Sequence, residues 1–204
     1  MLLGCGELTI RLMSDQPGAA EVLLFWFGPP DERGKRHKRW FVKSEAFDRE
    51  VRERFLALYE EAAAGKLAHL KATAQECLAL IILLDQFPRN MFRGTPRAFA
   101  SDPLALETAR HALAQGFDRT MLPVERMFVY LPFEHSEALA DQLESCELTR
   151  PLEVYPETND VYRYAVAHRD IIRRFGRFPH RNALLGRAST PEELEFLKGP
   201  GSSF

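Results

Sequence analysis

Eight consecutive residues, 77–84, carry no polar side chain, and this run limits the folds open to the chain. Thr73 and Glu76, directly before it, have the spacing of a capping box, in which both side chains satisfy backbone donors at a helix N-terminus. Pro88 follows the run and disfavours helical geometry at Phe87, so the spacing predicts a helix that ends at residues 85–88. A helix that is apolar on every side lies in the centre of a domain. The run therefore predicts a buried central helix.

Start and stop signals elsewhere in the chain predict further helices. Ser44 precedes a long segment in which Phe47, Val51 and Phe55 recur on one helical face, up to Gly65. Other helix starts are predicted at Asp15, Asp102, Pro123, Ser136, Thr158 and Thr190. No segment alternates convincingly with the period that marks a strand. We therefore expect an all-α fold of about eight helices in stacked antiparallel hairpins.

The length of 204 residues fits a single domain. We assign residues 1–14 to a loose N-terminal lead-in, 15–198 to the domain and 199–204 to a frayed tail.

Composition and motifs exclude several classes of function. The net charge of -2 provides no basic field that would attract nucleic acid. No apolar run approaches the roughly 20 residues that a membrane-spanning helix needs. Cys5, Cys77 and Cys146 form no CxxC pair, which argues against a disulfide framework and favours a reducing, cytoplasmic location. No HExxH motif or glycine-rich phosphate loop is present, so the sequence predicts neither a metal site nor a cofactor.

Asp85 follows the apolar run at a helix C-terminus, where the helix dipole disfavours a carboxylate. If its side chain is also buried it needs a cation, and Arg89 and Arg93 are the nearest in the chain. One interpretation is a structural ion pair that fixes the turn at Pro88. The other is that Asp85 orients an arginine whose free edge binds a ligand carboxylate or phosphate.

His168 lies on the apolar face of a predicted helix that ends at Gly176. A lone inward-facing histidine is typical of a hydrogen-bonded core residue, but it can also be an acid–base group. The polar residues that follow this helix can line one pocket with it: Arg177, His180, Arg181 and Asn182. Alternatively, the arginines only complement the negative end of the helix dipole.

Residues 132–137 form a predicted tight turn between two helices. Glu134 and His135 can form an acid–base pair there. The backbone N–H groups of a helix that starts at Ser136 can bind an anion. Helix capping and loop hydrogen bonds also explain these residues.

Two turns share one pattern, Gln-Phe-Pro-Arg-Asn at residues 86–90 and Arg-Phe-Pro-His-Arg-Asn at residues 177–182. Each follows a long helix and delivers an Arg-Asn pair. We predict that the two turns meet in space, so that Arg89, Arg93, Arg177 and Arg181 concentrate positive charge at one rim. The alternative is that each arginine caps its own helix at opposite ends of the domain.

Several motifs together resemble the bacterial domain-of-unknown-function family numbered 924. They are LFWFG at residues 24–28, DQFPRNMFR at 85–93, PFEHSE at 132–137 and FGRFPHRN at 175–182. The resemblance covers roughly residues 17–198 and implies an all-α, tetratricopeptide-like fold, with no established activity. It also implies that the polar residues of these motifs belong to the family's pattern: Asp85, Arg89, Asn90, Arg93, Glu134, His135, His168, Arg177, His180, Arg181 and Asn182.

Two functions remain open. The first is a pocket for a small anionic molecule, enzymatic or not, in which His168 or His135 is the acid–base group and Arg89 and Arg181 clamp the anion. The second is a helical interaction module whose groove binds a peptide or a protein. A closed pocket with converging polar side chains favours the first function, and an open groove along several helices favours the second.

Overall fold

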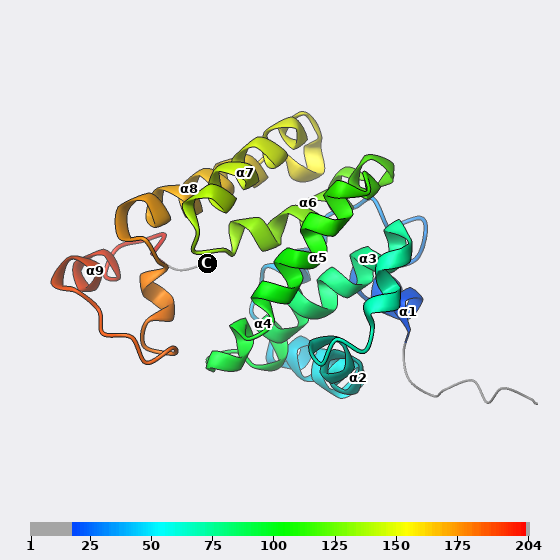
Figure 1. Ribbon diagram of the computed structural model, residues 1–204, viewed down its shortest axis with the longest axis horizontal. Coiled ribbons are helices and arrows are strands. Elements are labelled where there is room, and N and C mark those ends of the chain that lie inside the picture. The colour runs from blue at the N-terminus through cyan, green and yellow to red at the C-terminus, as the bar shows by residue number, and fades with distance from the viewer. Residues whose placement is uncertain (1–17, 203–204) are drawn as a thin grey trace, which may run out of the picture.

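The computed structural model describes residues 18–202 and is all-α in that range (Figure 1). Its α-helices are α1 (Ala19–Phe27), α2 (Glu45–Ala63), α3 (Ala74–Ile81), α4 (Phe87–Met91), α5 (Asp102–Ala114), α6 (Pro123–Glu134), α7 (Leu139–Thr149), α8 (Val161–Phe175) and α9 (Pro191–Phe196). A π-helical turn, Ile82–Gln86, joins α3 to α4 without a break, so the two form one helical stretch. The prediction of an all-α chain with about eight helices is therefore confirmed.

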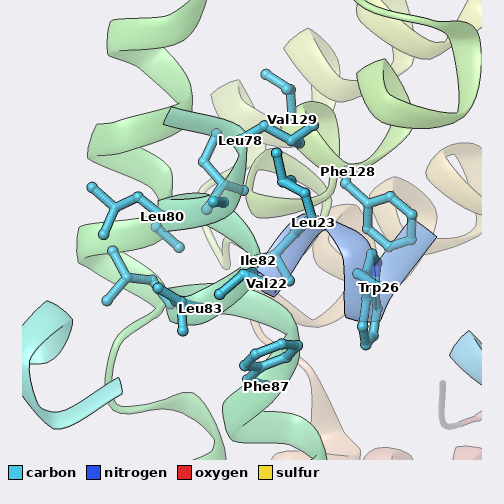
Figure 2. Packing of buried hydrophobic residues seen from close by; sticks show 14 of the residues in the cluster. Val22, Leu23, Trp26, Leu78, Leu80, Ile82, Leu83, Phe87, Phe128 and Val129 are labelled. Atoms are coloured by element: carbon cyan, nitrogen blue, oxygen red, sulfur yellow. The ribbon is translucent and has the colours of Figure 1, made fainter. Parts of the chain in front are cut away.

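Helix α3 lies at the centre of the core, as predicted. Each of residues 77–84 is at most 3 % exposed. Figure 2 shows Leu78, Ile82 and Leu83 packed beside side chains of α1 and α6, among them Trp26 and Phe128. An element that is apolar on all sides can be covered on all sides only in the middle of the domain.

The predicted end of this helix at residues 85–88 is wrong. Pro88 has no N–H for the carbonyl of Leu84, and a proline inside a helix normally leaves that carbonyl without a donor. Here the Ser101 hydroxyl donates to Leu84 O at 2.6 Å, and the Arg89 guanidinium donates to Asp85 O. The helix widens into the π-helical turn, where Phe87 N–H donates to Ile82 O, and continues through Pro88 into α4. Turns of this kind occur often at functional sites.

Helix starts agree with the sequence where a side chain caps the backbone. The hydroxyls of Ser44, Thr73 and Thr190 accept from the backbone N–H three residues later, as predicted. At three other predicted starts the helix begins elsewhere or the side chain has another partner. The residues concerned are Asp102, which pairs with arginines, Ser136, which lies before α7, and Thr158, whose hydroxyl donates to Leu152 O. The predicted cap Asp15 lies outside the described residues.

A second, smaller apolar cluster lies between α8 and α9, around Ile171, Ile172 and Phe178. Helices α7 and α8 run side by side, and the chain after α8 turns back toward the start of α5 (Figure 1). The end of α6, the start of α5 and residues 178–187 are thereby brought together. In the described part of the chain, no helix combines the length and the apolar character that crossing a membrane requires.

Candidate functional site

Asp85 is the centre of a buried polar cluster and has no exposed surface. His135 Nδ1 lies 2.7 Å from its Oδ1, Arg89 lies 3.3 Å from the same oxygen, and the Gln86 amide donates to Oδ2 at 2.5 Å. Burial alone would raise the pKa of Asp85, but Arg89 and His135 outweigh it and hold this pKa well below its usual range. Asp85 is therefore ionised and paired, as the sequence predicted, with Arg89 and not Arg93.

The two Phe-Pro turns meet at Asp102. Arg89 donates to both carboxylate oxygens, at 3.0 and 3.1 Å, and Arg181 Nη1 lies 3.4 Å from Asp102 Oδ2. The structure thus brings the two arginines to one carboxylate at the first residue of α5. The negative charge of Asp102 between the two guanidiniums offsets their mutual repulsion.

Arg181 is held by aromatic rings and has incomplete polar contacts. Its guanidinium carbon lies 4.7 Å from the ring centroid of Phe99 and 4.5 Å from that of Phe178. The side chain is only 8 % exposed, and its Nε has no hydrogen-bond partner among the described residues. Burial, with the nearby charge of Arg89, lowers the pKa of Arg181 to about 10. A buried guanidinium with an unused donor is chemically suited to receive an anion.

His135 has the tautomer of an oriented base. Its Nδ1 faces the ionised Asp85 carboxylate, which only accepts, so Nδ1 carries the proton and donates. In the neutral ring the lone pair then resides on Nε2. Burial, followed by the charge of Arg89, lowers the pKa of His135 despite the attraction of Asp85, so the ring is neutral at pH 7.

Glu134 and His168 form a second carboxyl–imidazole pair, with His168 Nδ1 3.1 Å from Glu134 Oε1. Nδ1 also lies 2.9 Å from Tyr164 O, a carbonyl that only accepts, so Nδ1 is protonated. Burial raises the pKa of Glu134 to about 8 and lowers that of His168 to about 3. This pair is therefore neutral at pH 7, whereas the Asp85 carboxylate of the first pair is charged. The predicted contact between Glu134 and His135 is replaced by these two separate pairs.

A pocket of about 350 Å³ opens beside the cluster. Its polar wall consists of Asp102, His135, Ser136, Glu137 and Arg181. Apolar side chains form most of the remaining wall: Pro96, Phe99, Pro103, Leu106, Pro132 and Leu185. The volume is near the lower end of the range for small-molecule sites.

Ser136 does not form a nucleophile–base pair with His135. Its hydroxyl donates to Asp141 Oδ2 at 2.6 Å and accepts from Ala138 N–H. Glu137 is held by Arg187 at 2.6 Å and by the Phe178 N–H at 2.7 Å. The pocket wall thus contains a base, His135, and a cation, Arg181. The Ser136 hydroxyl is hydrogen-bonded to Asp141 and is not activated by a base.

Some of the predicted site residues lie elsewhere. Asn90 and Arg93 both donate to Asp48 of α2, at 2.7 Å for each side chain. Arg177 binds both carboxylate oxygens of Glu193 on α9, and Asn182 contacts the same carboxylate. These groups fasten helices to one another. The hypothesis of one site for all of the family's polar residues is therefore too broad.

His180 lies between these groups. Its ring centroid is 5.6 Å from that of Phe178, and burial lowers its pKa to about 4. It directly precedes Arg181 in the turn Pro179–Arg181 but is not a wall residue of the pocket.

Asp102, Glu137 and Phe99 are wall residues that the sequence did not assign to the site. Asp102 directly precedes Pro103, and this dipeptide predicted a helix cap in place of an arginine partner. Glu137 belongs to the PFEHSE motif, and this position in the motif was a sequence signal that could have assigned it to the site. Phe99 carries no local signal, because only the fold brings its ring to Arg181.

The two described cysteines, Cys77 and Cys146, are free and buried. Burial raises the pKa of Cys77 to about 11, which agrees with an inert core thiol. Cys5 lies outside the described residues.

Comparisons with known proteins agree with this description of the fold. The model of a family described as bacterial protein of unknown function (DUF924) matches residues 22–201. The solved structure of ATU0120, a protein of unknown function from Agrobacterium tumefaciens, is similar with a TM-score of 0.79 and 43 % sequence identity. The similarity covers 89 % of this chain and 97 % of that one. No curated protein matches.

Proposed function

We propose that this chain, which belongs to the DUF924 family of bacterial proteins, binds a small anionic molecule in the pocket beside His135 and Arg181. The observation that carries the proposal is the state of Arg181. This guanidinium is almost completely buried, lines the pocket and has a donor, Nε, without a partner among the described residues. Nε itself has almost no accessible surface, so a bound carboxylate or phosphate would supply the missing acceptor after the side chains around this atom shift.

The attraction of an anion to this pocket is local to Arg181, because the cluster as a whole has as many negative as positive groups. With His135 neutral, the carboxylates of Asp85, Asp102 and Glu137 face three guanidiniums, those of Arg89, Arg181 and Arg187. Asp102 is bound bidentately by Arg89, and Glu137 is bound bidentately by Arg187. Arg181 has the weakest polar contact of the three arginines and is the one on the pocket wall.

His135 is the acid–base group of this proposal. It lines the pocket, its neutral form has a lone pair on Nε2, and Asp85 fixes its orientation. His168 and Glu134, the other two acid–base candidates, are not wall residues. Of the three acid–base candidates, His135 is therefore the one to which we assign proton transfer to or from a bound molecule.

A tetratricopeptide-like interaction module is the alternative. The contacts between successive helices from α5 to α8 are compatible with stacked hairpins. However, the polar side chains converge at helix ends, where α6 stops and α5 starts, instead of following a groove along several helices. This convergence supports the small-molecule pocket.

A thermal-shift titration with acetate and with inorganic phosphate at low ionic strength tests the proposal. We expect at least one anion to raise the melting temperature of the wild-type protein, and Arg181→Gln to abolish this rise. Arg93→Ala is the matched control, because Arg93 is bound to Asp48 and is absent from the pocket wall. An equal rise in wild type and Arg181→Gln, with both folded by circular dichroism, would exclude the pocket as the binding site.

A further inference from the structure

We infer that the ligand is a monocarboxylate with an apolar body, an inference that rests on the proposed function and narrows it to a chemical class. Among the described residues that line the pocket, Arg181 is the one cation, whereas two carboxylates, Asp102 and Glu137, lie on the same wall. Asp102 is paired with Arg89, which it shares with Asp85, and Glu137 is paired with Arg187, so a single negative charge can be accommodated at Arg181. A second negative charge would find no further cation among the described lining residues.

The donors of Arg181 suit a planar group. Its Nη1 faces Asp102, while Nε has no partner among the described residues. The rings of Phe99 and Phe178 hold the guanidinium at 4.7 and 4.5 Å from their centroids, which restricts the plane in which it can bind. A flat carboxylate can bind side-on to a guanidinium edge within such a plane.

The rest of the pocket suits an apolar body. Beyond the polar wall, the lining consists mainly of proline, leucine and phenylalanine side chains from the turn Pro96–Phe99, α5, the end of α6 and residue 185. Among the described residues that line this part, none is a cation that could hold a polar tail. An apolar chain buried there would gain affinity with each methylene that leaves water.

Binding of acetate, hexanoate, hexanol and inorganic phosphate to the intact protein, measured by calorimetry, tests this class. We expect hexanoate to bind at least about 10-fold more tightly than acetate, from the burial of its extra methylenes. Hexanol has the tail without the charge, and phosphate has the charge without the tail, so both should bind more weakly than hexanoate. Arg181→Lys keeps the positive charge but removes Nε, and it should weaken hexanoate by about 10-fold.

Leu185→Ser tests the apolar wall separately. Leu185 is partly exposed, so its replacement leaves the core intact. We expect this variant to reduce the advantage of hexanoate over acetate while acetate itself binds as in wild type.

The outcomes separate the two proposals. Hexanoate binding no more tightly than acetate, or phosphate binding more tightly than hexanoate, would overturn the ligand class and leave anion binding at Arg181 intact. Hexanol binding as tightly as hexanoate would overturn the carboxylate. No binding of any anion that depends on Arg181 would overturn the proposed function as well.

Discussion

The Nδ1 atom of His135 lies 2.7 Å from Oδ1 of Asp85, a carboxylate with no exposed surface. Asp85 belongs to the π-helical turn before Pro88, and His135 directly follows α6. The contact therefore links the most irregular part of the central helix to the pocket wall. It gives the imidazole one orientation and one tautomer, which is the arrangement a positioned base requires.

We expect Asp85→Asn to destabilise the protein by about 3 kcal/mol, because a buried carboxylate is lost from between Arg89 and His135. Arg89 keeps Asp102 as a partner, which limits the loss. Urea unfolding monitored by circular dichroism measures the change. Asp48→Asn is the matched control, since Asp48 pairs with the half-exposed Arg93, and it should cost about 1 kcal/mol or less. Equal losses in the two variants would contradict the special role of burial at Asp85.

We expect Leu80→Ala to cost about 2–5 kcal/mol, because Leu80 is 3 % exposed at the centre of the core and its truncation leaves a cavity. Leu24→Ala removes the same atoms from a side chain that is 55 % exposed, so it should change the free energy of unfolding by less than about 0.5 kcal/mol. The difference between the two variants in the same denaturant titration is the measurement. A loss below about 1 kcal/mol at Leu80 would show that α3 is not the centre of the core.

The fold was largely predictable because its signals are local. The apolar run at residues 77–84 and the caps at Ser44, Thr73 and Thr190 depend on side chains close in sequence. The passage of the helix through Pro88 was not predictable, because its missing hydrogen bond is replaced by Ser101, which is distant in the chain.

The candidate site was predictable only in its residue types. Asp85 at a helix exit demanded a cation, and the two similar turns indicated that Arg89 and Arg181 meet. The sequence contains no signal that Arg93 and Arg177 pair with Asp48 and Glu193 instead. Such choices depend on which helices pack together, and the ion pairs at their contacts follow from that packing.

We expect Glu134→Gln to stabilise the protein at pH 8 and to have little effect near pH 5. The pKa of Glu134 rises from 4.5 to about 8 in the folded state, so folding favours the protonated form. The stability of the wild type is then fully present below pH 4.5 and is lost as the pH rises toward 8, by about 1 kcal/mol per pH unit. Glutamine resembles the protonated acid and does not titrate, so the variant lacks this loss.

Chemical denaturation of the wild type and of Glu134→Gln at several pH values between 5 and 8 measures the difference in their free energies of unfolding. Groups that titrate in both proteins contribute equally and cancel in this difference. Glu137→Gln is the control, because the pKa of Glu137 is lowered by Arg187 and its carboxylate is ionised over the whole range. A constant difference between wild type and Glu134→Gln over this range would contradict a protonated Glu134.

Finally, we expect hexanoate to bind more tightly at pH 6 than at pH 8. Burial and Arg89 lower the pKa of His135 in the free protein, and the charges of the surrounding cluster cancel while this ring is neutral. A carboxylate bound at Arg181 adds a negative charge beside the ring and favours its protonated form, so the pKa of His135 rises in the complex. A ligand that raises a pKa binds with uptake of a proton, and its affinity therefore increases as the pH falls between the pKa values of the complex and the free protein. Calorimetry at pH 6, 7 and 8 measures both the affinity and the protons taken up. His135→Gln should still bind hexanoate, but with an affinity that does not change with pH. If wild type and His135→Gln show the same pH dependence, His135 does not face the bound anion, and its role as the base of this site is wrong.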